Sequence, residues 1–236
     1  MSGILGAMFG GSGVLVLDIS NTVSPNIGSL LLAAGWDAAS PVRLEVSPGA
    51  LVNTLAVPGI SFPAGIYLYV GAGARIGGVR GAAGMAGGVA FSTAVPILVE
   101  NYGVISGGGG GGGGGGTAWV ERYGDMVWGI GGAGGDGQGF INAGSLTIIP
   151  AGVGSYGTSS TTTATGGGTW GGGAGYATAT GGAGGAGGNW RQAGWSGGAA
   201  SVSGSYDASG VAAASSGRPA GANFTGPITW VIRGDA

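Results

Sequence analysis

The chain has 236 residues, a formal net charge of −2 and 63 glycines, so glycine is about four times as frequent as in an average protein. Proline occurs only 9 times, which excludes a collagen repeat and a proline-rich linker. Cysteine, histidine and lysine are absent, which excludes disulfides, Cys/His metal sites and catalysis by histidine or lysine. The seven basic residues are scattered arginines that form no basic stripe, so we expect no nucleic-acid partner, and we expect no cofactor.

Residues 1–70 contain short β-prone runs separated by proline and glycine, and they predict a small β-rich unit. The clearest runs are Val14–Leu17, Val42–Val46 and Ile66–Val70. The segment Leu30–Trp36 is compatible with a helix of about two turns, limited by Gly35. The start of the chain has no positively charged segment and no apolar stretch reaches about 18 residues, so we expect neither a signal peptide nor a membrane-inserted segment.

Glycine arrives in clusters from residue 71 onward, which predicts a second unit over residues 71–236. The apolar segments Ala94–Ile105, Ser145–Pro150 and Ile228–Ile232 lie between or after these clusters and are strand-like. The clusters span residues 71–88, 103–116, 129–139, 166–175, 181–188 and 194–204. The repeated pattern is therefore a strand, a glycine run and a loop.

A glycine run is usually a flexible linker, but the tryptophans in this region argue against that interpretation. Several lie inside or beside the glycine clusters, and each would offer roughly 150–250 Å² of mostly apolar surface to water if the region were unfolded. Glycine can form an extended helix with three residues per turn, which has no internal hydrogen bonds and must pair with neighbouring chains. We therefore predict an all-β, partly irregular protein: a small β-rich N-terminal unit followed by a glycine-rich sandwich of packed polyglycine II helices with projecting loops.

Loops on a rigid scaffold are where binding residues concentrate, and the intervals between glycine runs are the candidate loops. The expected loops are Thr117–Trp128, Gly152–Thr165, Tyr176–Thr180, Asn189–Trp195 and Ser205–Pro219. Tryptophan, tyrosine and arginine are enriched at binding hot spots. The candidate receptor-binding residues are Trp119, Arg122, Tyr123, Trp128, Trp170, Tyr176, Trp190, Arg191, Trp195 and Tyr206. An open alternative is that some of these tryptophans only cover the ends of the glycine helices.

The segment Asn101–Ser106, followed by the uninterrupted run Gly107–Gly116, is similar to the N-x-G-x-I-x strand that leads into polyglycine in the distal tail-fibre adhesins of T-even-like bacteriophages. The ending from Gly221 to Trp230 also resembles the C-termini of these tips, and the likeness covers roughly residues 66–236. The resemblance implies a receptor-binding protein at the distal end of a tail or tail fibre in the virion. It further implies that the N-terminal unit attaches to other tail proteins and that the loops bind a bacterial outer-surface protein or glycan.

Other motifs point to catalysis or metal binding, and the residues argue against each. Gly131–Gly139 fits part of a calcium-binding nonapeptide, but Gln138 replaces the required large apolar residue and the motif occurs once. Glu121 and Asp125 form a carboxylate pair of the kind glycosidases use, but two acids in one loop beside Arg122 are more often solvated or ion-paired. We therefore predict no metal site and no enzymatic activity.

The rival function class is a structural or ice-binding glycine-rich protein with flat threonine and alanine faces. Such a protein should keep a regular three-residue register of small side chains. Tryptophan, tyrosine and arginine interrupt that register here, which favours an adhesin. The residues do not count subunits, although an assembly of three chains is compatible with the cyclic symmetry of many oligomers.

Overall fold

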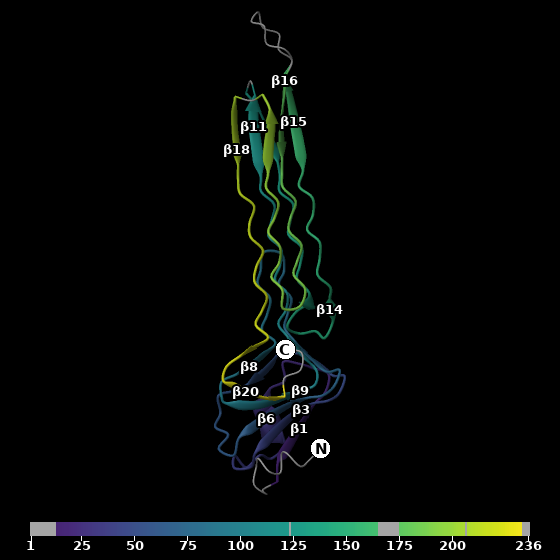
Figure 1. Cartoon of the computed structure of the whole chain (residues 1–236), viewed down its shortest axis with the longest axis vertical. Helices are drawn as coiled ribbons and strands as arrows, with labels where there is room; N and C mark the ends of the chain where they lie inside the picture. The colour runs from purple at the N-terminus through teal and green to yellow at the C-terminus, as the bar shows by residue number, and fades with distance from the viewer. Residues whose placement is uncertain (1–12, 123, 165–174, 206, 233–236) are drawn as a thin grey trace, which may run out of the picture.

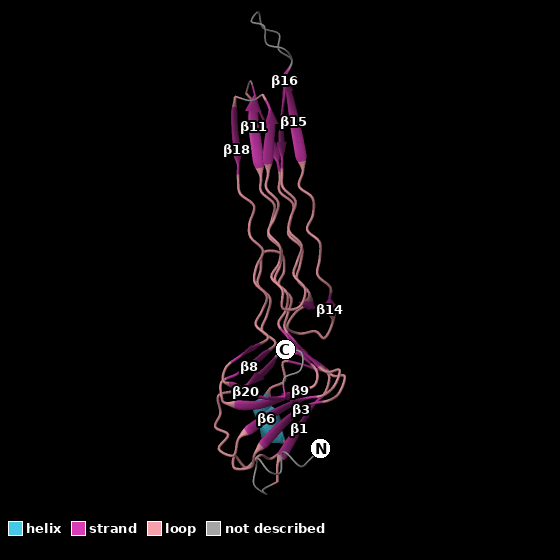
Figure 2. Ribbon diagram, in the orientation of Figure 1, coloured by secondary structure: helices cyan, strands magenta, loops and turns pink. Residues whose placement is uncertain are grey.

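The computed structural model describes residues 13–122, 124–164, 175–205 and 207–232. The molecule is elongated, with a strand-rich body at one end, long irregular segments running parallel to the long axis, and a small strand-rich tip at the other end (Figure 1). We call the long segments rods. Within the described residues the structure is β-rich, with one helix in the body (Figure 2).

The body is a coil of strands that visits three parallel sheets in turn. The five-stranded sheet has the order β1 (Leu15–Ile19), β3 (Val42–Val46), β6 (Ile66–Val70), β9 (Ile97–Asn101) and β20 (Ile228–Ile232). The four-stranded sheet has the order β10 (Val104–Ser106), β7 (Arg75–Gly77), β4 (Leu51–Asn53) and β2 (Thr22–Val23). The three-stranded sheet has the order β19 (Phe224–Thr225), β8 (Phe91–Thr93) and β5 (Leu55–Val57). The strands of each coil therefore stack on those of the coil before.

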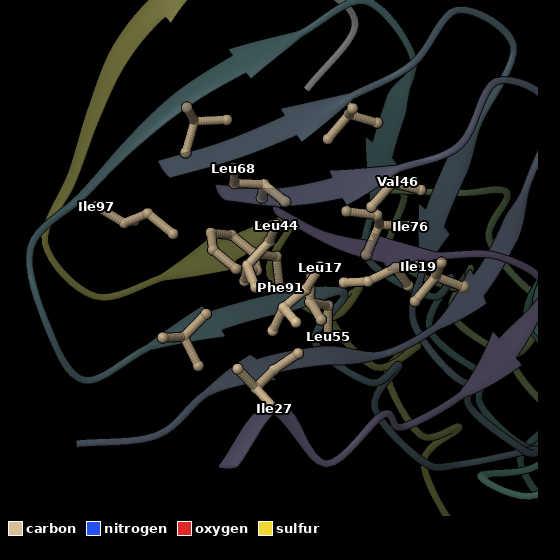
Figure 3. Close-up of a cluster of buried hydrophobic side chains, with 14 of the residues drawn as sticks. Leu17, Ile19, Ile27, Leu44, Val46, Leu55, Leu68, Ile76, Phe91 and Ile97 are labelled. Carbon is tan, nitrogen blue, oxygen red and sulfur yellow. The ribbon is translucent and has the colours of Figure 1, made fainter. Parts of the chain in front are cut away.

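Aligned apolar side chains fill the inside of this coil. Leu17, Leu44 and Leu68 occupy matching positions in three adjacent strands, and all three are buried (Figure 3). Because side chains alternate between the two faces of a strand, this register sends every second residue of each strand into one core. The predicted strands Val42–Val46 and Ile66–Val70 are confirmed with the same boundaries.

The helix α2 (Ile27–Ala33) takes the place in the first coil that a strand of the three-stranded sheet takes in later coils. Asn26 caps its start by accepting a hydrogen bond from the amide of Ser29. The helix ends shortly before Gly35, which has a φ of 69° that favours glycine. The expected helix over Leu30–Trp36 is thus displaced toward the N-terminus, because the Asn26 cap sets where it begins.

The body does not end at residue 70, because strands from the glycine-rich half complete all three sheets. β9 pairs with β6, and β20 pairs with β9 although more than a hundred residues separate them. Most of the glycine-rich region is an insertion between β10 and β19. A shorter excursion, which we call the short hairpin, spans residues 78–88 between β7 and β8.

Six rods can be followed in the described chain, and they span residues 107–116, 130–137, 151–158, 181–188, 193–200 and 212–221. The first rod is central and bonds to its neighbours with a period of three. Amides at Gly109, Gly112 and Gly115 donate to carbonyls at Gln138, Gly135 and Gly132. Amides at Gly110, Gly113 and Gly116 donate to carbonyls at Gln192, Trp195 and Gly198, and that at Gly111 donates to Met85 of the short hairpin. All three faces of the central rod are therefore covered.

Complete coverage explains why the central rod contains only glycine. A Cβ atom at any of its positions except Gly114 would lie within 2.5 Å of a neighbouring backbone atom, and Gly114 has 3.7 Å of clearance. Peripheral rods keep glycine only where they face a neighbour. In the rod 130–137, Ile130 and Ala133 are exposed while Gly132 and Gly135 are buried. Side chains thus return wherever a face reaches solvent.

At the far end the rods become two antiparallel sheets that pack on each other. One has the order β12 (Asp125–Gly129), β11 (Ala118–Arg122) and β18 (Ala208–Val211). The other has the order β15 (Ser159–Ala164), β16 (Gly175–Thr180) and β17 (Ser201–Gly204). Their shared core is small and consists of Ala118, Val120, Ala177 and Ala179, with Val127, Ala200 and Val202 packed against it.

The expectation of loops over Thr117–Trp128 and Tyr176–Thr180 is wrong, because both are mainly strand. The small residues that alternate along them pack inward as a thin alanine and valine core. A final short ladder joins β13 (Gly139–Phe140) to β14 (Ile148–Ile149), inside the segment Ser145–Pro150 that we expected to be a strand. Among the described residues no helix has the length and apolar character needed to cross a bilayer.

Candidate functional site

The outer face of the sheet β12-β11-β18 carries two tryptophans side by side. Trp119 stands opposite Trp128 on one neighbouring strand and opposite Gly210 on the other. The two indole rings are 6.3 Å apart between centroids and tilted by 43°. Because Ala118 and Val120 point into the core, alternation places Trp119 on the outer face.

Gly210 provides the space over which Trp119 lies. A Cβ atom on residue 210 would stand 2.3 Å from Nε1 of Trp119, and the three nearest atoms that it meets all belong to the indole. At most glycines of the rods, by contrast, the nearest atom belongs to a neighbouring backbone. Glycine at position 210 therefore makes room for the Trp119 side chain, whereas the glycines of the rods allow two backbones to approach each other.

Large apolar side chains on this face are open to solvent. Met126 is 48% exposed, Trp128 51% and Ile130 60%. Their spacing of two residues places them on one side of β12 and its continuation. Sequence reasoning selected Trp128 but missed Met126 and Ile130, although the alternation Met126-Val127-Trp128 was a usable signal.

The charged residues of the tip sit on both faces of the same sheet. Glu121 stands one step beyond Trp119 on the outer face, opposite Met126 and Ala208. Arg122 points the other way, is 8% exposed, and donates a hydrogen bond of 2.6 Å from Nη1 to the carbonyl of Ser205. Arg122 therefore links two parts of the tip and presents little surface to a partner.

The second tip sheet presents hydroxyl groups on its outer face. Thr180 pairs with Ser159 and Ser201 across the sheet, and its Oγ1 lies 3.1 Å from the hydroxyl of Ser159. Tyr176, a sequence candidate, lies on the same face as Thr180 and is 60% exposed. The tip thus has one apolar, acidic face and one neutral hydroxyl face.

The family model of the phage tail fibre adhesin Gp38 matches residues 14–236 of the chain. The chain belongs to this family. It is therefore a phage tail fibre adhesin, a virion protein of the distal end of the tail fibre. The resemblance noted in the sequence is confirmed.

One solved structure is similar in overall course, the crystal structure of the gp37-gp38 adhesin tip complex of the bacteriophage S16 long tail fiber. The match has a TM-score of 0.48 and 20% sequence identity, and it covers 98% of this chain and 84% of that one. A search of curated proteins found no match.

In this adhesin the remaining sequence candidates lie apart from the tip sheets. Trp190 is at the base of the rods, where its ring meets Phe140 edge-on at 6.0 Å and the guanidinium of Arg75 lies 5.1 Å from its centroid. Burial at this place lowers the pKa of Arg75. Trp190 thus belongs to the junction between the body and the rods.

Arg191 is exposed at the same turn, has a φ of 63°, and donates its amide to the carbonyl of Gly107. Trp195 is 70% exposed on the rod 193–200. Tyr123, Trp170 and Tyr206 lie outside the described residues. The structure therefore brings together Trp119 and Trp128, places Tyr176 on the other tip sheet, and separates Trp190, Arg191 and Trp195 from them.

The segment Gly131–Gly139, which resembles a calcium-binding nonapeptide, has a structural role in the adhesin. The carboxylate of Asp136 accepts a hydrogen bond from Arg80, with which it also forms an ion pair, and another of 2.9 Å from the amide of Ala83. Both donors belong to the short hairpin. In the described part of the chain no three histidine, cysteine, aspartate or glutamate residues are grouped as metal ligands.

Proposed function

We propose that the adhesin recognises a bacterial outer-surface protein or glycan through its tip and that the face bearing Trp119 and Trp128 makes the central contact. The observation that carries this proposal is the row Met126, Trp128 and Ile130, three large apolar side chains that stay exposed at the end farthest from the body. Exposed apolar patches mark interaction sites, and tryptophan is enriched at binding hot spots. Tyr176 on the second face is a further candidate contact.

We infer that the rods are polyglycine II helices. The period of three in their hydrogen bonds supports this, as does the absence of positive φ angles from Gly107–Gly116. Packed rods of this kind form a rigid stem because successive amides of the central rod are bonded to different chain segments. The tip would then be held at a fixed height above the body.

We propose that the body attaches the adhesin to other tail fibre proteins, in the way that gp38 stands in complex with gp37 at the S16 fibre tip. β1, β2 and β5 are edge strands of their sheets, at the end of the coil where the chain begins. A pocket of about 410 Å³ lies beside β1 and β2 and is lined in part by Asp18, Asn21 and Asn26. The proposal includes three further points. The first 70 residues act as the attachment unit, three chains assemble together, and the adhesin has no enzymatic activity.

The test is a binding assay of the labelled full chain on cells of a phage-sensitive strain, with competition between the chain and phage for adsorption. Replacing Trp128 or Trp119 with alanine should reduce binding by about tenfold or more, as hot-spot residues do. Leu32→Ala is the matched control, because Leu32 is 83% exposed on α2 in the body. Folded chain that binds no sensitive strain would refute the proposal and leave a structural role as the better account.

A further inference from the structure

The two tryptophans of the tip stand beside a carboxylate without a counter-ion among the described residues of their face. Glu121 is half-buried and makes no ion pair within the described part of the chain. Asp125 is the cross-strand partner of Arg122 and lies on the opposite face of the sheet from Glu121, and Arg122 is bonded there to the carbonyl of Ser205, so neither residue neutralises Glu121 on the outer face. The outer face is therefore acidic as well as aromatic.

An aromatic face next to a carboxylate is suited to a cation. The face of an indole ring attracts ammonium and guanidinium groups more strongly than the ring of tyrosine or phenylalanine does. A carboxylate at the rim adds an ion pair and a charge-assisted hydrogen bond. Trp119 and Trp128 offer two ring faces, and Glu121 lies in the next row of the same sheet.

Gly210 keeps this surface in place. A methyl group at residue 210 would overlap the Trp119 indole, and the side chain would swing away more readily than the backbone would move. Trp119 would then lose its fixed distance to Trp128. Gly210 is thus a positioning residue for the aromatic pair.

We propose that this face binds an arginine or lysine side chain that projects from the receptor among apolar residues. The inference rests on the proposed function and specifies which chemical group of the receptor the tip would bind. Met126 stands opposite Glu121, and Trp128 and Ile130 continue the exposed apolar row away from it. These side chains need apolar counterparts, which favours a protein partner over a glycan. The acidic charge also disfavours phosphate-bearing surfaces.

The test compares the affinities of labelled full-chain variants for cells of a sensitive strain at low and high salt. Glu121→Gln should lower the affinity about threefold or more and flatten its salt dependence. Trp119→Phe should lower it about 2- to 30-fold. Gly210→Ala should approach the Trp119→Phe value and weaken the near-ultraviolet circular dichroism that arises from the tryptophan pair. Asp37→Asn, which removes an exposed carboxylate from the body, should leave the affinity and its salt dependence unchanged.

Two chemical treatments of the cells identify the source of the cation. Blocking arginine with a dicarbonyl reagent or lysine by acetylation should abolish binding, and so should protease treatment. Binding that survives protease but is lost after periodate oxidation would overturn the protein assignment. If Trp128→Ala weakens binding while Glu121→Gln does not, the cation proposal is refuted and the proposed function stands. If neither change has an effect in folded protein, the proposed function itself fails.

Discussion

A methyl group on Gly112 would stand 1.9 Å from the carbonyl oxygen of Gly185 in a neighbouring rod. That oxygen is fixed, because it accepts the amide of Gly135 from a third rod. A methyl group on Gly114, two residues further on, would have no neighbouring atom closer than 3.7 Å. Glycine is therefore indispensable at position 112 but replaceable at position 114 of the same rod.

We expect Gly112→Ala to destabilise the adhesin by at least about 3 kcal/mol, because rods must separate to admit the methyl group. Gly114→Ala should change the free energy of unfolding by less than about 1 kcal/mol. Chemical denaturation of the two variants measures the difference. Equal stabilities would contradict the close packing of the central rod.

Trp190 should matter for stability and not for receptor recognition. A Cβ atom on Gly77 would lie 2.8 Å from its ring, so the indole fills the junction above β7. Trp190→Ala should cost about 2–4 kcal/mol by leaving a cavity. Trp195→Ala is the control, because that side chain is 70% exposed and its loss should cost little. A loss of adsorption by folded Trp190→Ala protein would instead assign Trp190 to the receptor contact.

Asp136 should hold the short hairpin rather than calcium. Asp136→Ala removes the acceptor for Arg80 and for the Ala83 amide, so hydrogen exchange over residues 78–88 should accelerate. The loss of stability should be about 1 kcal/mol, since both partners are partly exposed. Asp125→Ala at the tip should leave the hairpin unchanged. Calcium should not alter the melting temperature of the unmodified adhesin, and a rise would restore the metal interpretation.

Asp37 should give the body an acid-sensitive contact. Hydrogen bonds from the Ser40 and Ala39 amides lower the pKa of its carboxyl group below the ordinary value of about 3.9. Because the folded pKa is the lower one, this stabilisation is present above the unfolded pKa and is lost as the pH falls through the folded pKa. Nuclear magnetic resonance titration should give a midpoint below about 3.9, and Asp37→Asn should lose less stability on acidification than the native chain. A midpoint at the ordinary value would contradict the hydrogen bonds.

The strands of the body were predictable where one residue in two faces the core, as in Val42–Val46. Their assembly was not, because parallel pairing such as that of β9 with β20 joins segments far apart in the sequence and leaves no local pattern. For the same reason, the sequence did not indicate that most of the glycine-rich half is inserted into one coil of the body.

At the tip, the aromatic candidates could be selected but not placed. Trp119 and Trp128 meet because β11 and β12 form a hairpin, whereas Trp190 is drawn to the opposite end of the rods. The strands themselves were misjudged as loops because their core is built from alanine, as at Ala177 and Ala179, and gives almost no hydrophobic signal.

The period of three in the rod contacts fixes how the length of this stem can change during evolution. An insertion of one or two residues in a single rod would rotate the residues that follow it, so that side chains would point at a neighbouring rod where only a glycine hydrogen fits. An insertion of three residues would return each residue to its original orientation. Even then, the bonded neighbours must lengthen together to keep their amides paired. With the polyglycine II geometry proposed above, each step is about 9 Å. The sequence of the tip sheets can therefore vary freely, whereas the distance between the tip and the body changes only in whole steps.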